Sequence, residues 1–395
     1  MPPYLAGRQH ETDEFRRFLL QDIILENLIL TGLRGIGKTV LLENFKPIAI
    51  QGGWQWVGTD LSESTSVSEE TMAIRLLTDL SVVTAGITVT QRKSPVHFEQ
   101  GVSTQQAVLT YAKLHEIYAG TPGVPADKLK AVFEFAWAML SQLNCRGVVF
   151  AYDEAQNLAD HATKDQYPLS LLLDVFQSIQ RKNIPFMLAL TGLPTLFPRL
   201  VEARTYSERM FHIITLKPLT KPDTREAVTV PIKNSGCPFT LDDTSIETIW
   251  SITRGYPYFV QFVCRAAYDI WVQDVLADRP ISSIPTREIL LKLDADFFAG
   301  RWARATDRQR QLLALIASLP NADEEFTVQD VVEQSRQRAG KSFSPSHVNQ
   351  MLAALGDRGL IYKNRHGKYC FAVPLMAQFI RRQPIDLHEV YELFE

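Results

Sequence analysis

The chain has little of what marks secreted, zinc-binding or membrane-spanning proteins. Its four cysteines, Cys145, Cys237, Cys264 and Cys370, are widely spaced and form no C-x-x-C pair. This spacing argues against a disulfide framework or a cysteine zinc site and is typical of reduced thiols. No apolar run approaches the ~18–20 residues that a membrane-spanning helix needs, and the first residues lack the pattern of a signal peptide. We therefore expect a cytoplasmic protein.

The chain also lacks a large excess of charge of one sign. The net charge is −3 over 395 residues, so no field of the whole molecule favours nucleic acid. A hydrophobic content of 46% and a charged content of 22% are ordinary for globular proteins. The length predicts two or three domains with ample core.

The most informative segment covers residues 27–43, where an apolar run precedes a glycine-rich stretch and a helical pattern. The stretch reads Gly-x-x-x-x-Gly-Lys-Thr over residues 32–39, which predicts a phosphate-binding loop between a strand and a helix. Its amide groups and the helix N-terminus favour an anion. Lys38 can reach the β- and γ-phosphates and thereby also assist catalysis, and the Thr39 hydroxyl can ligate Mg²⁺. The predicted nucleotide-binding residues here are Gly32, Gly35, Gly37, Lys38, Thr39 and Val40.

A second segment supplies what hydrolysis needs. Residues 148–152 are apolar and predict a buried parallel strand that ends in Asp153 and Glu154. Ligands bind at the carboxyl ends of such strands. We predict that Asp153 holds Mg²⁺ together with Thr39, and that Glu154 orients and polarises the attacking water.

A third apolar run, Ile184–Leu193, ends in Thr191 and Gly192. A polar residue at the end of a strand beside the Asp-Glu strand can contact the γ-phosphate or the water, so Thr191 is a candidate catalytic sensor. The alternative is a threonine that only begins a Gly-Leu-Pro turn.

Alternating strand and helix patterns over residues 1–217 predict an α/β class domain, with a three-layer parallel core. Within it, residues 88–101 have poor periodicity and are interpreted as a loop or insertion. Residues 218–300 read as a helical lid, in which Pro231 interrupts or ends the first helix. We assign 301–383 to a further domain and 384–395 to a C-terminal tail.

The domain at 301–383 reads as three helices and a hairpin, over 307–318, 327–338, 344–358, 360–363 and 369–373. This order resembles a winged-helix domain, whose third helix enters the major groove in DNA-binding members. Residues 327–382 hold nine basic and three acidic residues, a net charge of +6. Lys363, Arg365 and Lys368 cluster at the hairpin, where phosphate contacts are expected. The third helix is poor in arginine, which favours backbone contacts over base readout.

Taken in order, these motifs resemble AAA+ ATPases, closest to the branch of origin-recognition initiators, transposition and secretion ATPases and the related STAND switch ATPases. Residues 4–8 resemble the segment that packs near adenine in these families, and residues 253–258 resemble the Gly-x-Pro motif of their lid. The resemblance implies ATP and Mg²⁺ as ligands and a homo-oligomer as the working state. It adds Tyr4, Gly7, Arg8 and Pro257 to the predicted nucleotide site.

Two arginine roles of the family stay open. Some relatives have an arginine after the lid proline, where this chain has Tyr258, so Arg254 or Arg265 is left to substitute. Arg209 lies where AAA+ proteins place the finger that reaches a neighbour's site, and it counts as a catalytic candidate. Arg204 is its rival.

We therefore expect an ATPase that acts as a switch or motor with DNA. The alternative is a signalling ATPase whose winged helix docks a protein partner.

Overall fold

The computed structural model describes residues 4–92, 104–236, 239, 241–280, 283–338 and 343–384. The chain divides into two compact units. One unit comprises residues 8–32 and 38–216, and the other comprises residues 1–7, 33–37 and 217–395. The finer division into core, lid and C-terminal domain stays a prediction.

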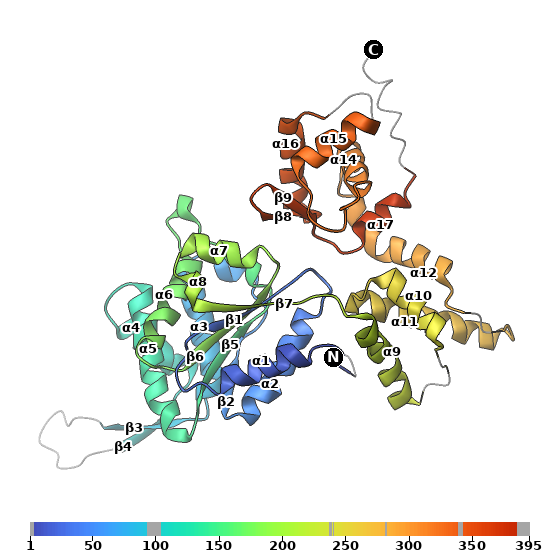
Figure 1. The fold of residues 1–395 in the computed structure, drawn as a ribbon. Coiled ribbons are helices and arrows are strands. Elements are labelled where there is room, and N and C mark those ends of the chain that lie inside the picture. Colours follow the sequence, from blue (N-terminus) through green and yellow to red (C-terminus); the bar gives the residue numbers. More distant parts are fainter. Residues whose placement is uncertain are drawn as a thin grey trace, which may run out of the picture. The chain divides into compact units, whose positions relative to one another are not determined.

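The first unit is built on a parallel sheet of five strands in the order β2-β5-β6-β1-β7 (Figure 1). All residues of β5 and β6 are buried, which explains their uninterrupted apolar sequences. Tyr152 pairs with Leu190, so the next residues along the two strands, Asp153 and Thr191, lie side by side at the carboxyl edge of the sheet. The strands are β1 (Asn27–Thr31), β2 (Trp54–Val57), β5 (Gly147–Tyr152), β6 (Phe186–Gly192) and β7 (Phe211–Thr215).

Helices cover both faces of this sheet, which confirms the predicted three-layer α/β core. On one face α1 (Gln9–Leu19) packs on α2 (Lys38–Gln51), where the rings of Phe15 and Phe45 stack at 4.1 Å. On the other face three helices share a hydrophobic cluster with alternate strand residues such as Phe150 and Leu188. These helices are α3 (Glu69–Thr84), α5 (Pro125–Leu140) and α6 (Pro168–Gln180). The unit also contains α4 (Tyr111–Gly120), α7 (Leu196–Ala203) and α8 (Ser207–Met210).

The stretch expected to be a loop over residues 88–101 begins differently. Thr88–Arg92 forms β3, which pairs antiparallel with β4 (Thr104–Val108). The segment Thr-Val-Thr-Gln-Arg alternates between polar residues and valine at its start, which suits a strand in a two-stranded ribbon. Residues 93–103 lie outside the described residues.

The described part of the second unit is helical apart from one hairpin. Its first helix begins with a capping box, in which the side chains of Thr220 and Asp223 bond each other's backbone amides. The helix continues through Pro231 to Ser235, so the expected break at Pro231 is wrong. The segment predicted to be a lid contains α9 (Lys221–Ser235), α10 (Asp243–Thr253), α11 (Pro257–Leu276) and α12 (Thr286–Leu293).

A π-helical turn, Asp294–Phe298, and α13 (Ala299–Trp302) connect α12 to the last segment. That segment has three helices, an antiparallel hairpin and a closing helix. Its elements are α14 (Asp307–Ala317), α15 (Val328–Arg338), α16 (Pro345–Asp357), β8 (Ile361–Arg365), β9 (Lys368–Phe371) and α17 (Met376–Arg381).

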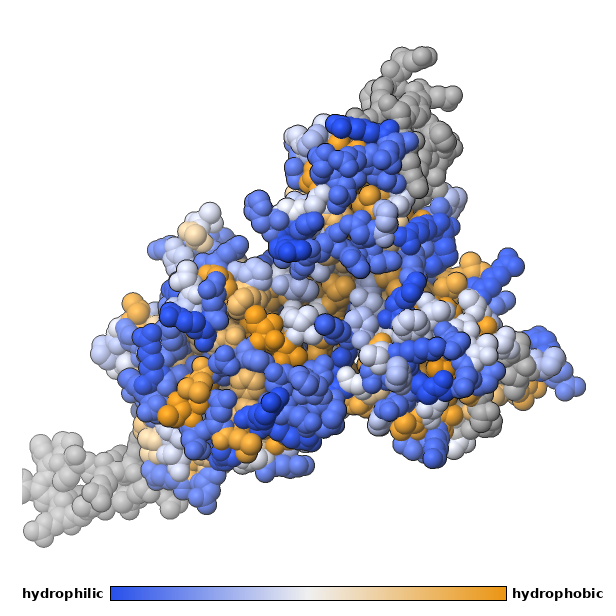
Figure 2. Space-filling model, in the orientation of Figure 1, coloured by the Kyte–Doolittle hydropathy of each residue, from blue (hydrophilic) through white to orange (hydrophobic). Residues whose placement is uncertain are grey.

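The surface seen in Figure 2 is mostly hydrophilic, with apolar residues in small groups over the α/β unit. Among the described helices, none has the length and apolarity needed to cross a membrane.

Candidate nucleotide site

The glycine-rich loop leads directly into α2, whose first residue is Lys38. Gly35 and Gly37 have φ values of +77° and +97°, a backbone conformation that side chains disfavour. Lys38 is buried, and its ammonium donates a hydrogen bond to the carbonyl of Gly32 at 2.9 Å. The cation is thus held within the loop, where the amide groups and the start of α2 also favour an anion.

The carboxylate of Asp153 is the centre of the candidate site. The hydroxyl of Thr39 donates to one of its oxygens, and the hydroxyl of Thr191 donates to the other. The amide of Glu154 also donates to Asp153, at 2.7 Å. Asp153 and Thr191 are buried. Three segments far apart in the sequence therefore meet at one carboxylate, and each was selected from the sequence by a separate motif.

This donor set fits Mg²⁺. The ion prefers oxygen ligands and is usually held by one or two protein groups together with phosphate oxygens and water. Thr39 and Asp153 supply a hydroxyl and a carboxylate that already touch. No group of three or more His, Cys, Asp or Glu residues that could hold a metal occurs in the described part of the chain. A site made of two protein ligands and substrate phosphates is what the residues offer.

Glu154 stands next to this centre in a backbone conformation that is rare for side chains other than glycine. Its φ is +52°, which typically costs about 1 kcal/mol or more. Its side chain is exposed, and one carboxylate oxygen accepts a hydrogen bond from the amide of Gln156. The sequence analysis missed Gln156, although its place two residues after Glu154, just beyond a strand end, was a usable signal.

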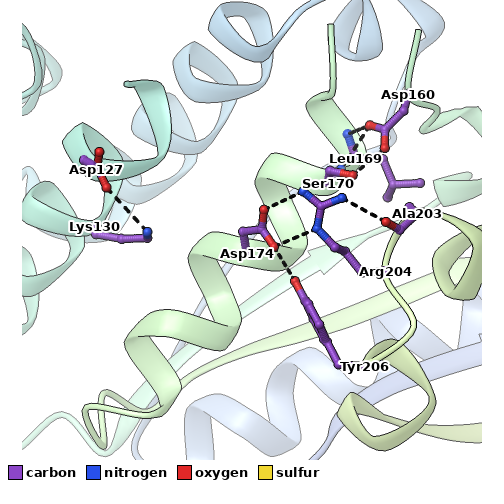
Figure 3. A network of polar contacts seen from close by, with 9 residues as sticks. All are labelled: Asp127, Lys130, Asp160, Leu169, Ser170, Asp174, Ala203, Arg204 and Tyr206. Atoms are coloured by element: carbon purple, nitrogen blue, oxygen red, sulfur yellow. Dashed lines mark hydrogen bonds and ion pairs between the residues drawn. The ribbon is translucent and has the colours of Figure 1, made fainter. Parts of the chain in front are cut away.

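The two candidate finger arginines differ in their partners. Arg204 donates to Asp174 through Nε at 2.9 Å and Nη2 at 2.8 Å, and Tyr206 donates to the same carboxylate at 2.6 Å (Figure 3). Burial raises the pKa of Asp174, but these hydrogen bonds outweigh it, so the pKa lies below its usual value. Arg209 is exposed, and no described residue forms a hydrogen bond or an ion pair with its side chain. Arg209 is thus the arginine available to another molecule.

The residues assigned near adenine fall into both units. Tyr4 and Gly7 belong to the second unit, where the Tyr4 hydroxyl donates to Glu226 at 3.0 Å. Gly7 has a φ of +61°, and Asp223 occupies the space that a side chain there would need. Arg8 belongs to the α/β unit, where it is buried and bonds Glu11 at 3.4 Å. Their place near adenine stays a prediction.

Pro257 is the first residue of α11, as a Gly-x-Pro helix start requires. The amide of Tyr258 donates to the Gly35 carbonyl at 3.1 Å, within the unit that includes residues 33–37. Of the proposed substitutes for a second sensor, Arg265 is exposed, and Arg254 ends α10 with a φ of +50°.

A further arginine near Tyr258, Arg301, was not recognised from the sequence. The guanidinium of Arg301 lies 4.0 Å from the centroid of the Phe297 ring, which packs against Tyr258. Burial, together with the charge of Arg34, lowers the pKa of Arg301.

Two solved structures have the same fold as this chain. The Walker-type ATPase of Pyrococcus abyssi is 16% identical, has a TM-score of 0.58, and the match covers 95% of this chain and 96% of that one. The ORC2 protein of Aeropyrum pernix, in its ADP form, is 14% identical, has a TM-score of 0.54, and the match covers 96% and 94%. At such identities the likeness shows the fold alone. The chain therefore has the fold of these two proteins, which agrees with the resemblance drawn from its sequence.

A family described as "Domain of unknown function (DUF8462)" matches residues 295–380. No curated protein matches the chain.

Proposed function

We propose that this chain binds ATP with Mg²⁺ and hydrolyses it to ADP and phosphate, using the energy to switch its conformation or assembly. The observation that carries the proposal is the convergence of the Thr39 and Thr191 hydroxyls on the carboxylate of Asp153, at the start of α2. The ADP form of the ORC2 relative with the same fold supports the choice of an adenine nucleotide.

Each residue has a separate task in this proposal. Lys38 and the loop amides bind the β- and γ-phosphates, while Thr39 and Asp153 hold Mg²⁺, which neutralises phosphate charge. Glu154 accepts the proton of the attacking water as the new P–O bond forms and the bond to the β-phosphate oxygen breaks. Thr191, which donates to Asp153, fixes the orientation of that carboxylate.

The test separates binding from chemistry. Glu154→Gln should bind ATP with wild-type affinity and hydrolyse it about 100-fold more slowly or worse, because a general base is lost while the metal ligand stays. ATP affinity by titration calorimetry and phosphate release in single turnover measure the two properties. Wild-type turnover by Glu154→Gln would remove Glu154 from its role.

We further propose that residues 301–383 form a winged-helix domain that contacts DNA. The order of α14, α15, α16 and the β8–β9 hairpin supports this reading. The exposed positions of α16 include Ser346, Asn349 and Gln350, which are polar and uncharged. Contacts with phosphates should therefore dominate over base readout.

The hairpin offers fewer free charges than its sequence suggests. Arg365 donates to the carboxylate of Glu325 through Nε at 2.9 Å. Asn364 donates to the same carboxylate at 2.6 Å. These bonds hold the pKa of Glu325 below its usual value, so the pair stays charged at neutral pH. The side chain of Lys363 is exposed, and no described residue forms a hydrogen bond or an ion pair with it. We therefore propose Lys363, together with Lys368, as the main phosphate contacts, although the charge of Lys368 also helps to lower the pKa of Glu325.

Most arginines of this segment are hydrogen-bonded within their own unit. This observation favours a second function, a signalling ATPase that docks a protein partner. Arg358, Arg381 and Arg382 all bond other residues of the same unit. A neutral α16 face would suit a protein as well as a nucleic acid. Duplex binding that weakens with salt supports the DNA reading, and absence of duplex binding at low salt supports the protein reading.

A further inference from the structure

Gln156 makes three contacts, which link Glu154 to the residues that follow β6. Its Nε2 donates to the carboxylate of Glu154, and its Oε1 accepts from the amide of Leu193 at 3.1 Å. Its own carbonyl accepts from Arg199 on α7, at 2.6 Å. The side chain is therefore fixed at both ends, and its backbone is anchored as well.

The space for this amide comes from Gly192. A side-chain carbon on Gly192 would lie 3.0 Å from the Gln156 Oε1 and 2.8 Å from Leu196. The Thr191-Gly192 pair at the end of β6 thus serves both acidic residues. Thr191 bonds Asp153, and Gly192 makes room for the side chain that bonds Glu154.

Glu154 has few other constraints. Its side chain is exposed, and its only described side-chain bond is the one from Gln156. An exposed glutamate samples several rotamers, and a loosely held reactive group loses rate. The hydrogen bond occupies Oε2, and no described residue bonds Oε1. That oxygen stays available to accept a proton from water.

We infer that Gln156 is a positioning residue that holds the Glu154 carboxylate in its working orientation and couples it to the end of β6. This inference rests on the proposed ATPase function. Gln156 does not touch the nucleotide; it acts through Glu154. Binding of ATP should therefore not depend on it, whereas the rate of the chemical step should.

The test uses two variants and a matched control in the full chain. Gln156→Ala removes the side chain, and Gln156→Glu keeps its size and its acceptor for Leu193 but removes the donor. Both should lower kcat for ATP about 10- to 100-fold, as loss of an orienting partner does, with KM within twofold of wild type. The control is Asn157→Ala, because Asn157 is in the same turn and bonds the Leu61 carbonyl at 2.8 Å instead. It should keep kcat within about twofold.

A double variant shows whether the effect passes through Glu154. In a Glu154→Gln background, Gln156→Ala should cause no further loss of kcat. A further loss as large as in wild type would overturn the inference, as would wild-type kcat in a folded Gln156→Ala. If the wild-type chain itself hydrolyses no ATP, the proposed function fails and the inference fails with it. If wild type hydrolyses ATP and only the Gln156 result differs, the inference alone is wrong.

Discussion

The carboxyl edge of the parallel sheet and the C-terminal hairpin both contain residues that the sequence predicted to be functional, but the bonding partners of these residues differ between the two regions. At the sheet edge, the side chains of Thr39 and Thr191 and the backbone amide of Glu154 all donate to Asp153. At the hairpin, Arg365 stays exposed but forms an ion pair with Glu325 of its own unit. A motif whose spacing follows from chemistry predicts geometry well, whereas a cluster of like charges does not show which charges are free.

The largest effect is expected where the three segments meet. Asp153→Asn removes the charge that Thr39 and Thr191 both contact, so it should lower ATP hydrolysis about 100-fold or more. Steady-state phosphate release measures it. As a control, Asp160→Asn alters a carboxylate that caps α6 and should leave turnover near wild type. Similar losses in both variants would point to general damage to the unit.

The next prediction compares Arg209, whose side chain has no described partner, with Arg204, which is bonded to Asp174. If Arg209 completes a neighbour's site, Arg209→Ala should bind ATP normally and hydrolyse it about 10-fold more slowly or worse. Mixing it with Lys38→Ala, which supplies an intact arginine, should restore part of the activity. Arg204→Ala should show no such rescue, because Arg204 bonds Asp174. Two folded, co-assembled variants without rescue would make Arg209 a surface residue.

A smaller effect is expected at the hairpin. Lys363→Ala with Lys368→Ala should weaken duplex binding equally for all sequences and reduce the log–log salt slope by roughly two units. Arg365→Ala should change the slope less, since its charge is already matched by Glu325. Affinities at several salt concentrations measure both. Equal slope changes for Arg365 and each lysine would show that the Glu325 pair opens to bind phosphate.

The smallest effect concerns pH. Because hydrogen bonds hold the pKa of Asp174 below its ordinary value, the Arg204 pair stabilises the fold above that value and loses this contribution as pH falls through the lowered pKa. Arg204→Ala should therefore lower the free energy of unfolding by about 1 kcal/mol or less at pH 7, since the pair is more than a third exposed. The difference from wild type should shrink below about pH 4. Denaturant melts at both pH values test this, and a difference that grows at low pH would contradict it.

Much of the fold followed from the sequence. Uninterrupted apolar runs predicted β5 and β6, and polar residues at their ends predicted the carboxyl edge. Pro231 was misjudged, because the helix continues past a residue that lacks an amide donor, with Val228 and Ile232 on either side packed in one hydrophobic cluster. The ribbon of β3 and β4 was misjudged because short polar strands have no apolar periodicity. The position of Gln156 two residues after Glu154 was a signal in the sequence, but its bond to Leu193 and the Arg365–Glu325 pair could not be recognised, since both depend on contacts that only the folded chain creates.

The central claim is that the loop and the Asp153 centre form one ATP–Mg²⁺ site, and titration of ATP into the wild type and Lys38→Ala in the presence of Mg²⁺ tests it most directly. The wild type should bind ATP with saturable, Mg²⁺-dependent heat. Lys38→Ala should show no binding over the same range, because the phosphates lose the cation that the loop holds. Equal affinities in the two proteins, both folded, would contradict the account.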